Sequence, residues 1–181
     1  MYHIKNDKRA VHSAECIKDA IIKQLKSKPI TEIGVSEIAQ ESKVSRSTFY
    51  RLFDTPTDVL KYICDTLIEE IHENYSTSHA TDKRGFVLNT LRFWMSHSDI
   101  LEAILRSGRS DILQNSMEKM TEEDTHVNFL SNLNETETKY IRAYHAAALC
   151  SILFVWASLG KKETAEELYE IYLKIYESTI A

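Results

Sequence analysis

A run of hydrogen-bond donors lies in the first third of the sequence, between residues 35 and 53. Hydroxyl, guanidinium and phenol groups of this kind contact the phosphates and base edges of double-stranded DNA. Arg46 and Ser47 are the best candidates for base edges, because an arginine can donate two hydrogen bonds to one guanine. The other donors would mostly contact phosphates. The full set of predicted DNA-binding residues is Ser36, Lys43, Ser45, Arg46, Ser47, Thr48, Tyr50 and Arg51.

These side chains can act on one ligand only if the stretch folds into two short helices joined by a tight turn. Apolar or small residues recur at helical spacing through it, namely Val35, Ile38, Ala39, Val44, Phe49, Leu52 and Phe53. Ala39 would let the two helices cross closely, Val44 would fix the turn in the core, and Ser45 is a good N-cap for the second helix. The outer face of that helix would then enter a major groove. The alternative is that its polar residues are an ordinary solvated helix surface.

The stretch resembles, in fixed register, the DNA-binding head of TetR-type (TetR/AcrR) transcriptional regulators. The matching positions are Ile38-Ala39, the segment from Ser42 to Ser45, Thr48, Tyr50, Phe53 and Leu60. Two positions depart from the family pattern. Lys43 replaces a glycine and tolerates a positive φ poorly, so the turn is expected to be slightly strained. Pro56 replaces a lysine; it suits a first helical position but offers no charge to a phosphate.

The charge distribution fits a local binding face on an otherwise acidic protein. The 181 residues have a formal net charge of −5, yet residues 1–60 hold ten Lys and Arg against eight Asp and Glu. Three cysteines lie far apart with no CxxC spacing, which predicts reduced thiols in a cytoplasm and no metal site. The most apolar stretch, residues 143–159, is too polar and marginally short for a membrane span, and no secretory segment is visible. We therefore expect a cytoplasmic protein with no cofactor and no membrane partner.

Only four glycines and two prolines interrupt the chain, which favours long helices over a β-rich fold. The sequence predicts an all-α protein. Residues 1–55 would form an N-terminal three-helix helix-turn-helix domain, whose first eight residues are polar and expected to fray. A helix over 56–76 would link it to a C-terminal helical ligand-binding and dimerisation domain over 77–181.

Resemblance to TetR-type regulators implies a ligand pocket between the helices of the second domain, with a small apolar or aromatic effector as the default ligand. The predicted lining residues are Phe93, Trp94, His97, Leu101, Met117, Tyr144, Cys150 and Trp156. Aromatic and methionine residues at helical spacing are more often plain core, and that alternative stays open.

The last helix, predicted over residues 163–178, carries two apolar stripes. The first contains Leu168, Ile171 and Ile175, and the second contains Ala165, Tyr169, Tyr172 and Tyr176. One stripe would cover the core of its own chain, and the other would meet a second chain in an intermolecular four-helix bundle. The predicted dimer residues are Phe154, Leu168, Tyr169, Tyr172 and Tyr176.

Two functions follow from this organisation. The first is a ligand-responsive repressor that binds a palindromic operator as a homodimer. The second is a coactivator or architectural factor whose C-terminal body binds another protein, for which the acidic segment 118–124 would be suitable. An enclosed cavity in the body would favour the first. A helical enzyme is not expected, because no nucleophile–base pair, carboxylate pair or glycine-rich phosphate loop stands out.

Overall fold

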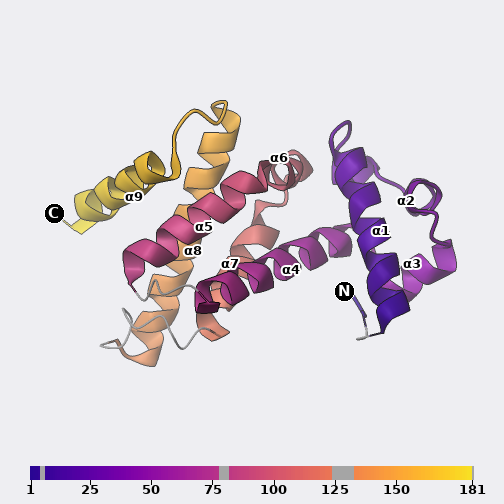
Figure 1. Ribbon diagram of the computed structural model, residues 1–181, viewed down its shortest axis with the longest axis horizontal. Helices are drawn as coiled ribbons and strands as arrows, with labels where there is room; N and C mark the ends of the chain where they lie inside the picture. Colours follow the sequence, from indigo (N-terminus) through magenta and orange to yellow (C-terminus); the bar gives the residue numbers. More distant parts are fainter. Residues whose placement is uncertain (5–6, 78–81, 124–132, 181) are drawn as a thin grey trace. The chain divides into compact units, whose positions relative to one another are not determined.

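The computed structural model describes residues 1–4, 7–77, 82–123 and 133–180, and over these residues the protein is helical with no strand (Figure 1). The predicted all-α fold is confirmed. The elements are α1 (Lys8–Leu25), the 3-10 turn η1 (Ile30–Glu32), α2 (Val35–Ser42), α3 (Arg46–Leu52), α4 (Pro56–Thr77), α5 (Lys83–Ser96), α6 (Ser98–Ser107), α7 (Ser110–Glu123), α8 (Glu135–Ser158) and α9 (Ala165–Ile180). Asp124, the last residue of the acidic segment 118–124, lies outside the described residues.

The chain divides into two compact units. The first contains Met1–Thr66 and Ala103–Ile112, and the second contains Leu67–Glu102 and Leu113–Ala181. Helix α4 therefore gives its first half to one unit and its second half to the other. The predicted second domain, residues 77–181, includes the segment 103–112. In the structure this segment belongs to the first unit.

The first unit is built on α1, which packs against α2 and α3. The apolar stripe of α1 is buried at every position, and its residues are Ala10, Ala14, Ile17, Ile21 and Leu25. Ile38 of α2 and Phe49 of α3 are also fully buried. The apolar stripe of α4 is buried too, with Leu60 and Ile63 in this unit and Leu67 and Ile71 in the second. Burial of one apolar face per helix accounts for the association of these four helices.

The end of α1 explains why the segment 103–112 belongs to this unit. The last carbonyl groups of a helix have no donor within the helix. Arg106 of α6 donates from Nη1 to the carbonyl groups of Lys26 and Leu25, at 3.0 and 3.4 Å. A guanidinium at this position also suits the negative end of the helix dipole.

The second unit packs α5, α8 and α9 against one another. The indole Nε1 of Trp156 donates to the carbonyl of Glu163 at 3.0 Å, which links α8 to the start of α9. Gly160 has a φ of 94° and follows the end of α8, as its sequence position predicts. Lys161, next to it, donates from Nζ to Ser98 at 3.1 Å and pairs with Glu102.

The tyrosine stripe of α9 faces the core of its own unit, which corrects the prediction that it meets a second chain. Tyr169 and Tyr172 are only 8% and 2% exposed, and Leu168 is buried beside them. The two other residues predicted for a dimer contact are half-buried, and they are Phe154 and Tyr176. Among the residues of α9 whose burial is described, the large apolar ones left exposed are Ile171 and Ile175, at 40% and 43%.

A lysine and a histidine explain why the tyrosines turn inward. The Lys83 Nζ lies 4.1 Å from the ring centroid of Tyr176, a favourable cation–π distance. The hydroxyl of Tyr172 and Nδ1 of His145 are 2.6 Å apart. Burial lowers the pKa of His145 to about 4, and the charge of Lys83 acts in the same direction. The imidazole is therefore neutral at pH 7, and its Nδ1 can accept a hydrogen bond from the Tyr172 hydroxyl.

The stability of the second unit is expected to fall as the pH drops from about 6.5 to about 4. The unfolded chain binds a proton at His145 near pH 6.5, whereas the folded chain does so only near pH 4. The contribution of His145 to the free energy of unfolding is thus complete above pH 6.5 and decreases through this window. Urea unfolding at several pH values, followed by the fluorescence of Trp94 and Trp156, would measure the effect. His145→Gln should have a shallower pH dependence, and equal slopes would contradict the prediction.

Candidate nucleic-acid interface

Helix α3 is held by a buried inner face and by a capping residue. Phe49 and Leu52 are buried on its inner side, and Phe53, which follows it, is buried as well. The Ser45 Oγ accepts a hydrogen bond from the backbone N–H of Thr48 at 3.1 Å. This bond satisfies one of the free donors in the first turn of the helix. The predicted cap and the predicted inner face are both confirmed.

The opposite face of α3 carries donors to the surface. Arg46, Ser47 and Arg51 are exposed, and Tyr50 is 51% exposed. The ring of Tyr50 lies edge-on to the ring of Phe49, with 5.6 Å between centroids. This contact supports Tyr50 from its buried side and leaves its hydroxyl free to reach outward.

The other residues predicted to bind DNA surround this face. Lys43 lies in the turn before α3, and Ser36 lies in the first turn of α2; both are exposed. The hydroxyl of Ser45 donates to Thr48 Oγ1 at 2.9 Å and lies 2.9 Å from Ser47 Oγ. The structure thus gathers the predicted residues on α3, its cap, the turn and the start of the neighbouring helix.

The positive charges of the first unit divide into paired and unpaired groups. Lys23 pairs with Glu41 at 2.5 Å, and Lys28 pairs with Glu37 at 2.6 Å. Throughout the described residues no ion pair is made by the cations of the turn and of α3, which are Lys43, Arg46 and Arg51. An unpaired cation keeps its charge for an anionic ligand, whereas a paired one is largely neutralised. The turn and α3 therefore carry three unpaired cations, while the other unpaired and exposed cations among the described residues of the first unit lie on α1 and at its C-cap, namely Lys8, Arg9 and Lys26.

The turn between α2 and α3 requires a left-handed backbone at Lys43, as expected from the glycine that it replaces. Its φ is 56° and its ψ is 22°. A residue with a Cβ adopts this conformation at a cost of roughly 1 kcal/mol. Val44 follows in the turn and is half-buried. Its backbone N–H donates to the Ser42 hydroxyl at 3.3 Å.

Residues 1–4 are not frayed, contrary to the prediction, because they pair with the segment after α3. Tyr2 and Phe53 form an isolated antiparallel bridge. The polar composition of residues 1–8 gives no reason to predict this contact. The one indication in the sequence is Tyr2, a large aromatic residue that a fully solvated end does not need.

The residues predicted to line a pocket are mostly packed core. Five of them are buried, and they are Trp94, Leu101, Met117, Cys150 and Trp156. Cys150 Sγ lies 3.3 Å from Met117 Sδ, and burial raises the pKa of the thiol to about 12. The remaining three are more exposed: Phe93 and His97 are half-buried and stack at 4.3 Å, and Tyr144 is exposed. The buried indole Nε1 of Trp94 has no hydrogen-bond partner among the described residues.

Within the described ranges, no group of three or more His, Cys, Asp or Glu side chains is placed to hold a metal ion. Helix α8 is long and apolar enough to cross a membrane by length and composition alone, and about a third of its most apolar window is buried (33%). It contacts α5 and α9, and Cys150 on it lies against Met117 of α7.

Residues 81–178 match the protein family TetR_C_8, which is the C-terminal region of transcriptional regulators. The match extends over more than half of the chain. The chain belongs to the TetR family of transcriptional regulators.

Similarity to other proteins agrees with this TetR membership. The chain is 24% identical to an uncharacterized HTH-type transcriptional regulator, YxbF, of Bacillus subtilis (strain 168), over 88% of the chain and 44% of that protein. The chain therefore spans less than half the length of this relative. Its fold is similar to that of Lin0861 from Listeria innocua, with a TM-score of 0.84 and 14% identity over 98% and 96% of the two chains. It is also similar to FadR of Bacillus subtilis in complex with stearoyl-CoA, with a TM-score of 0.58 and 16% identity over 89% and 96%.

Replacing Lys43 by glycine is expected to stabilise this TetR head, since glycine adopts a φ of 56° without strain from a Cβ. The gain is roughly 1 kcal/mol, reduced in part by the greater freedom of glycine in the unfolded chain. Thermal unfolding followed by far-UV circular dichroism would measure it. Lys43→Ala is the matched control, because it removes the charge and keeps the left-handed strain. The prediction fails if the two variants have the same Tm.

Proposed function

We propose that this TetR-family chain regulates transcription, as a repressor, by binding a palindromic operator in double-stranded DNA as a homodimer in the cytoplasm. One α3 helix would enter the major groove of each half-site. The observation that carries the proposal is the exposed row of donors and unpaired cations on a helix whose inner face is buried. These cations are available to an anionic ligand, whereas Lys23 and Lys28 are already paired with glutamates.

The proposed contacts divide by chemistry. Arg46 and Ser47 would read base edges, and the guanidinium of Arg46 would donate two hydrogen bonds to a guanine. Phosphate contacts would come from the remaining exposed donors, which are Ser36, Lys43, Tyr50 and Arg51. The hydroxyls of Ser45 and Thr48 already take part in the cap of α3, so we assign them mainly to its orientation.

We propose that the homodimer forms through the outward faces of α8 and α9. Two exposed apolar residues on and next to α8, Val155 and Leu159, are 55% and 63% exposed, and Ile171 and Ile175 supply the apolar face of α9. A second copy would bury these four residues in a bundle of four helices. The two α3 helices would then meet half-sites about 34 Å apart, or a multiple of this distance.

We further propose that a small apolar or aromatic effector binds in the second unit and favours a spacing of the two heads that does not fit the operator. The unpaired indole N–H of Trp94 supports this proposal, because a buried donor without an acceptor is costly and a ligand could supply one. The complex of FadR with stearoyl-CoA supports an effector by analogy of fold.

Selection of bound duplexes from a random pool would test the main proposal. The salt concentration must be fixed, because binding through phosphates depends strongly on salt. Enrichment of a palindrome whose half-sites are one or more helical turns apart would support a dimer with two reading helices. Enrichment of no sequence, or of one asymmetric site, would contradict it.

Arg46→Ala and Tyr50→Ala are each expected to abolish specific binding to the selected duplex. Both side chains are exposed, so Tm should change little, by the equivalent of about 0.5 kcal/mol or less. Fluorescence anisotropy with a labelled duplex and thermal unfolding would measure the two effects. Lys119→Ala, which removes an exposed charge from α7, is the control and should bind normally. Specific binding retained by both variants would remove the assignment of this face.

The double variant Ile171→Asp, Ile175→Asp is expected to be a folded monomer, since it introduces charge into the proposed apolar contact. Size-exclusion chromatography with light scattering would measure its mass. Its operator affinity should fall as well, because a monomer meets only one half-site. Tyr140→Asp, a change at an exposed tyrosine near the start of α8, is the matched control. A dimer retained by the double variant would exclude this surface.

A further inference from the structure

Residues Met1–Ile4, here called the N-terminal strap, connect the end of α3 to α4. The backbone N–H of His3 donates to the carbonyl of Leu52 at 2.7 Å, beside the bridge between Tyr2 and Phe53. Leu52 is the last residue of α3, so its carbonyl has no donor within the helix. The strap supplies this donor and thereby holds the C-terminal end of α3.

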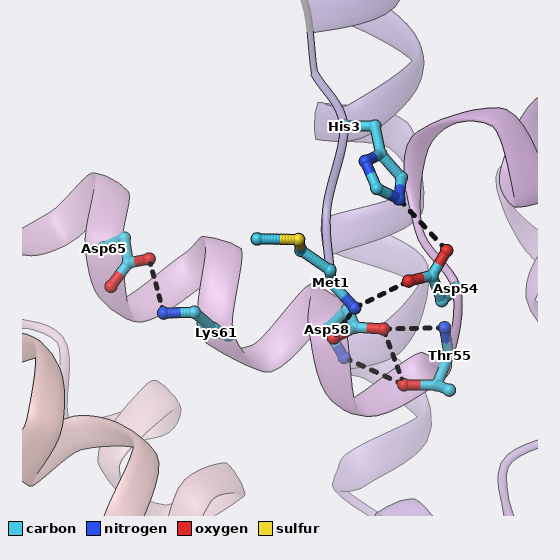
Figure 2. Close-up of polar contacts among 7 residues, drawn as sticks. All are labelled: Met1, His3, Asp54, Thr55, Asp58, Lys61 and Asp65. Carbon is cyan, nitrogen blue, oxygen red and sulfur yellow. Dashed lines mark hydrogen bonds and ion pairs between the residues drawn. The ribbon is translucent and has the colours of Figure 1, made fainter.

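Polar side chains hold the strap against the start of α4, as Figure 2 shows. The amino nitrogen of Met1 lies 2.9 Å from a carboxylate oxygen of Asp54 and 2.6 Å from one of Asp58. His3 Nε2 lies 3.1 Å from Asp54, and the hydrogen bond from the Met1 amino group helps to hold the pKa of Asp54 below its usual range. Most of these groups are exposed, so the pairs orient the strap more than they stabilise the fold.

Tyr2 also begins a continuous series of aromatic contacts that ends on the exposed face of α3. Its ring lies 5.6 Å from that of Tyr62 on α4, and Tyr62 lies 5.7 Å from Phe53. Phe53 lies 5.8 Å from Phe49, which lies 5.6 Å from Tyr50. Each step is a ring contact of the favourable edge-on or tilted kind. The series therefore connects the first ring to the side chains behind the proposed DNA-binding face.

The hydroxyl of Tyr2 fixes the other end of this series. It donates to Asp65 of α4 at 2.9 Å, about one turn beyond Tyr62. Asp65 also pairs with Lys61 at 3.4 Å (Figure 2). Tyr62 donates from its own hydroxyl to Glu15 of α1 at 3.0 Å. Tyr2 thus touches α4 with its side chain and the end of α3 with its backbone.

We propose that Tyr2 is a positioning residue for operator binding, because the strap fixes the direction of α3 against the first half of α4. This inference rests on the proposed function of α3. Tyr2 is half-buried against Tyr62 and is not part of the exposed donor face. Sequence-specific contacts need several donors to meet base edges at once, whereas contacts to phosphates alone tolerate small changes in direction. Loss of the Tyr2 ring should therefore weaken specific binding more than non-specific binding.

The test compares wild type, Tyr2→Ala and Tyr2→Phe on the selected duplex and on a duplex of scrambled sequence. Tyr2→Ala should bind the selected duplex roughly 10-fold more weakly and the scrambled one within about 2-fold of wild type. Tyr2→Phe keeps the ring and loses only the bond to Asp65, so its loss should be smaller, about 3-fold. Tyr140→Ala, a change at an exposed tyrosine of α8, should bind like wild type.

Measurements of stability and of salt dependence distinguish a positioning role of Tyr2 from a merely structural role and from direct contact with phosphates. All binding is measured well below each Tm, so a merely structural role would lower Tm and leave the ratio of specific to non-specific affinity unchanged. A smaller salt slope in Tyr2→Ala would mean that the strap itself contacts phosphates. Either result, or equal affinity of wild type and both variants, would overturn the proposal. Failure of wild type and Tyr140→Ala to bind any selected duplex would instead remove the proposed function, and this inference with it.

Discussion

The burial of Phe49 and its neighbours on the inner side of α3 is the constraint on which the rest of the head depends. With seven residues, α3 is too short to be stable as an isolated helix. Its direction is therefore set by what it buries, by the Ser45 cap before it and by the N-terminal strap after it. Because the inner face is fixed, Arg46 and Tyr50 have only one surface left on which to lie. The proposed reading face is thus a consequence of packing.

The chain is acidic overall, and this is compatible with a DNA-binding surface because, within the part of the chain that the structure describes, the arginines of α3 are not paired with carboxylates. Glu37 and Glu41 neutralise two lysines of the first unit, and no such partner is found for Arg46 or Arg51 among the described residues. The net charge of −5 describes the whole molecule, while a phosphate group responds to the charges within about 10 Å of it. Local charge is therefore the better guide to the ligand.

Local features of the fold could be predicted from the sequence, and features that join distant segments could not. The stripes of α1 and α4 and the Ser45 cap follow from spacing and residue type. The left-handed turn at Lys43 follows from the resemblance to TetR-type regulators, whose pattern has a glycine there. The contact of Arg106 with α1 joins residues 80 positions apart, which no local pattern reveals. The structure turns the tyrosines of α9 inward, against the prediction, because tyrosine and isoleucine are equivalent in an apolar pattern. Only the fold brings Lys83 and His145 to the tyrosines.

The hydrogen bonds from Arg106 to the end of α1 mean that the head is not a self-contained segment of the sequence. The path of the chain passes between the two units three times, after Thr66, Glu102 and Ile112, so neither unit is a continuous stretch of sequence. A chimera that joined residues 1–66 to the body of another regulator would leave the last carbonyl groups of α1 without the guanidinium that binds them here. Transfer of this head to another body would therefore have to include the segment 103–112 as well as residues 1–66.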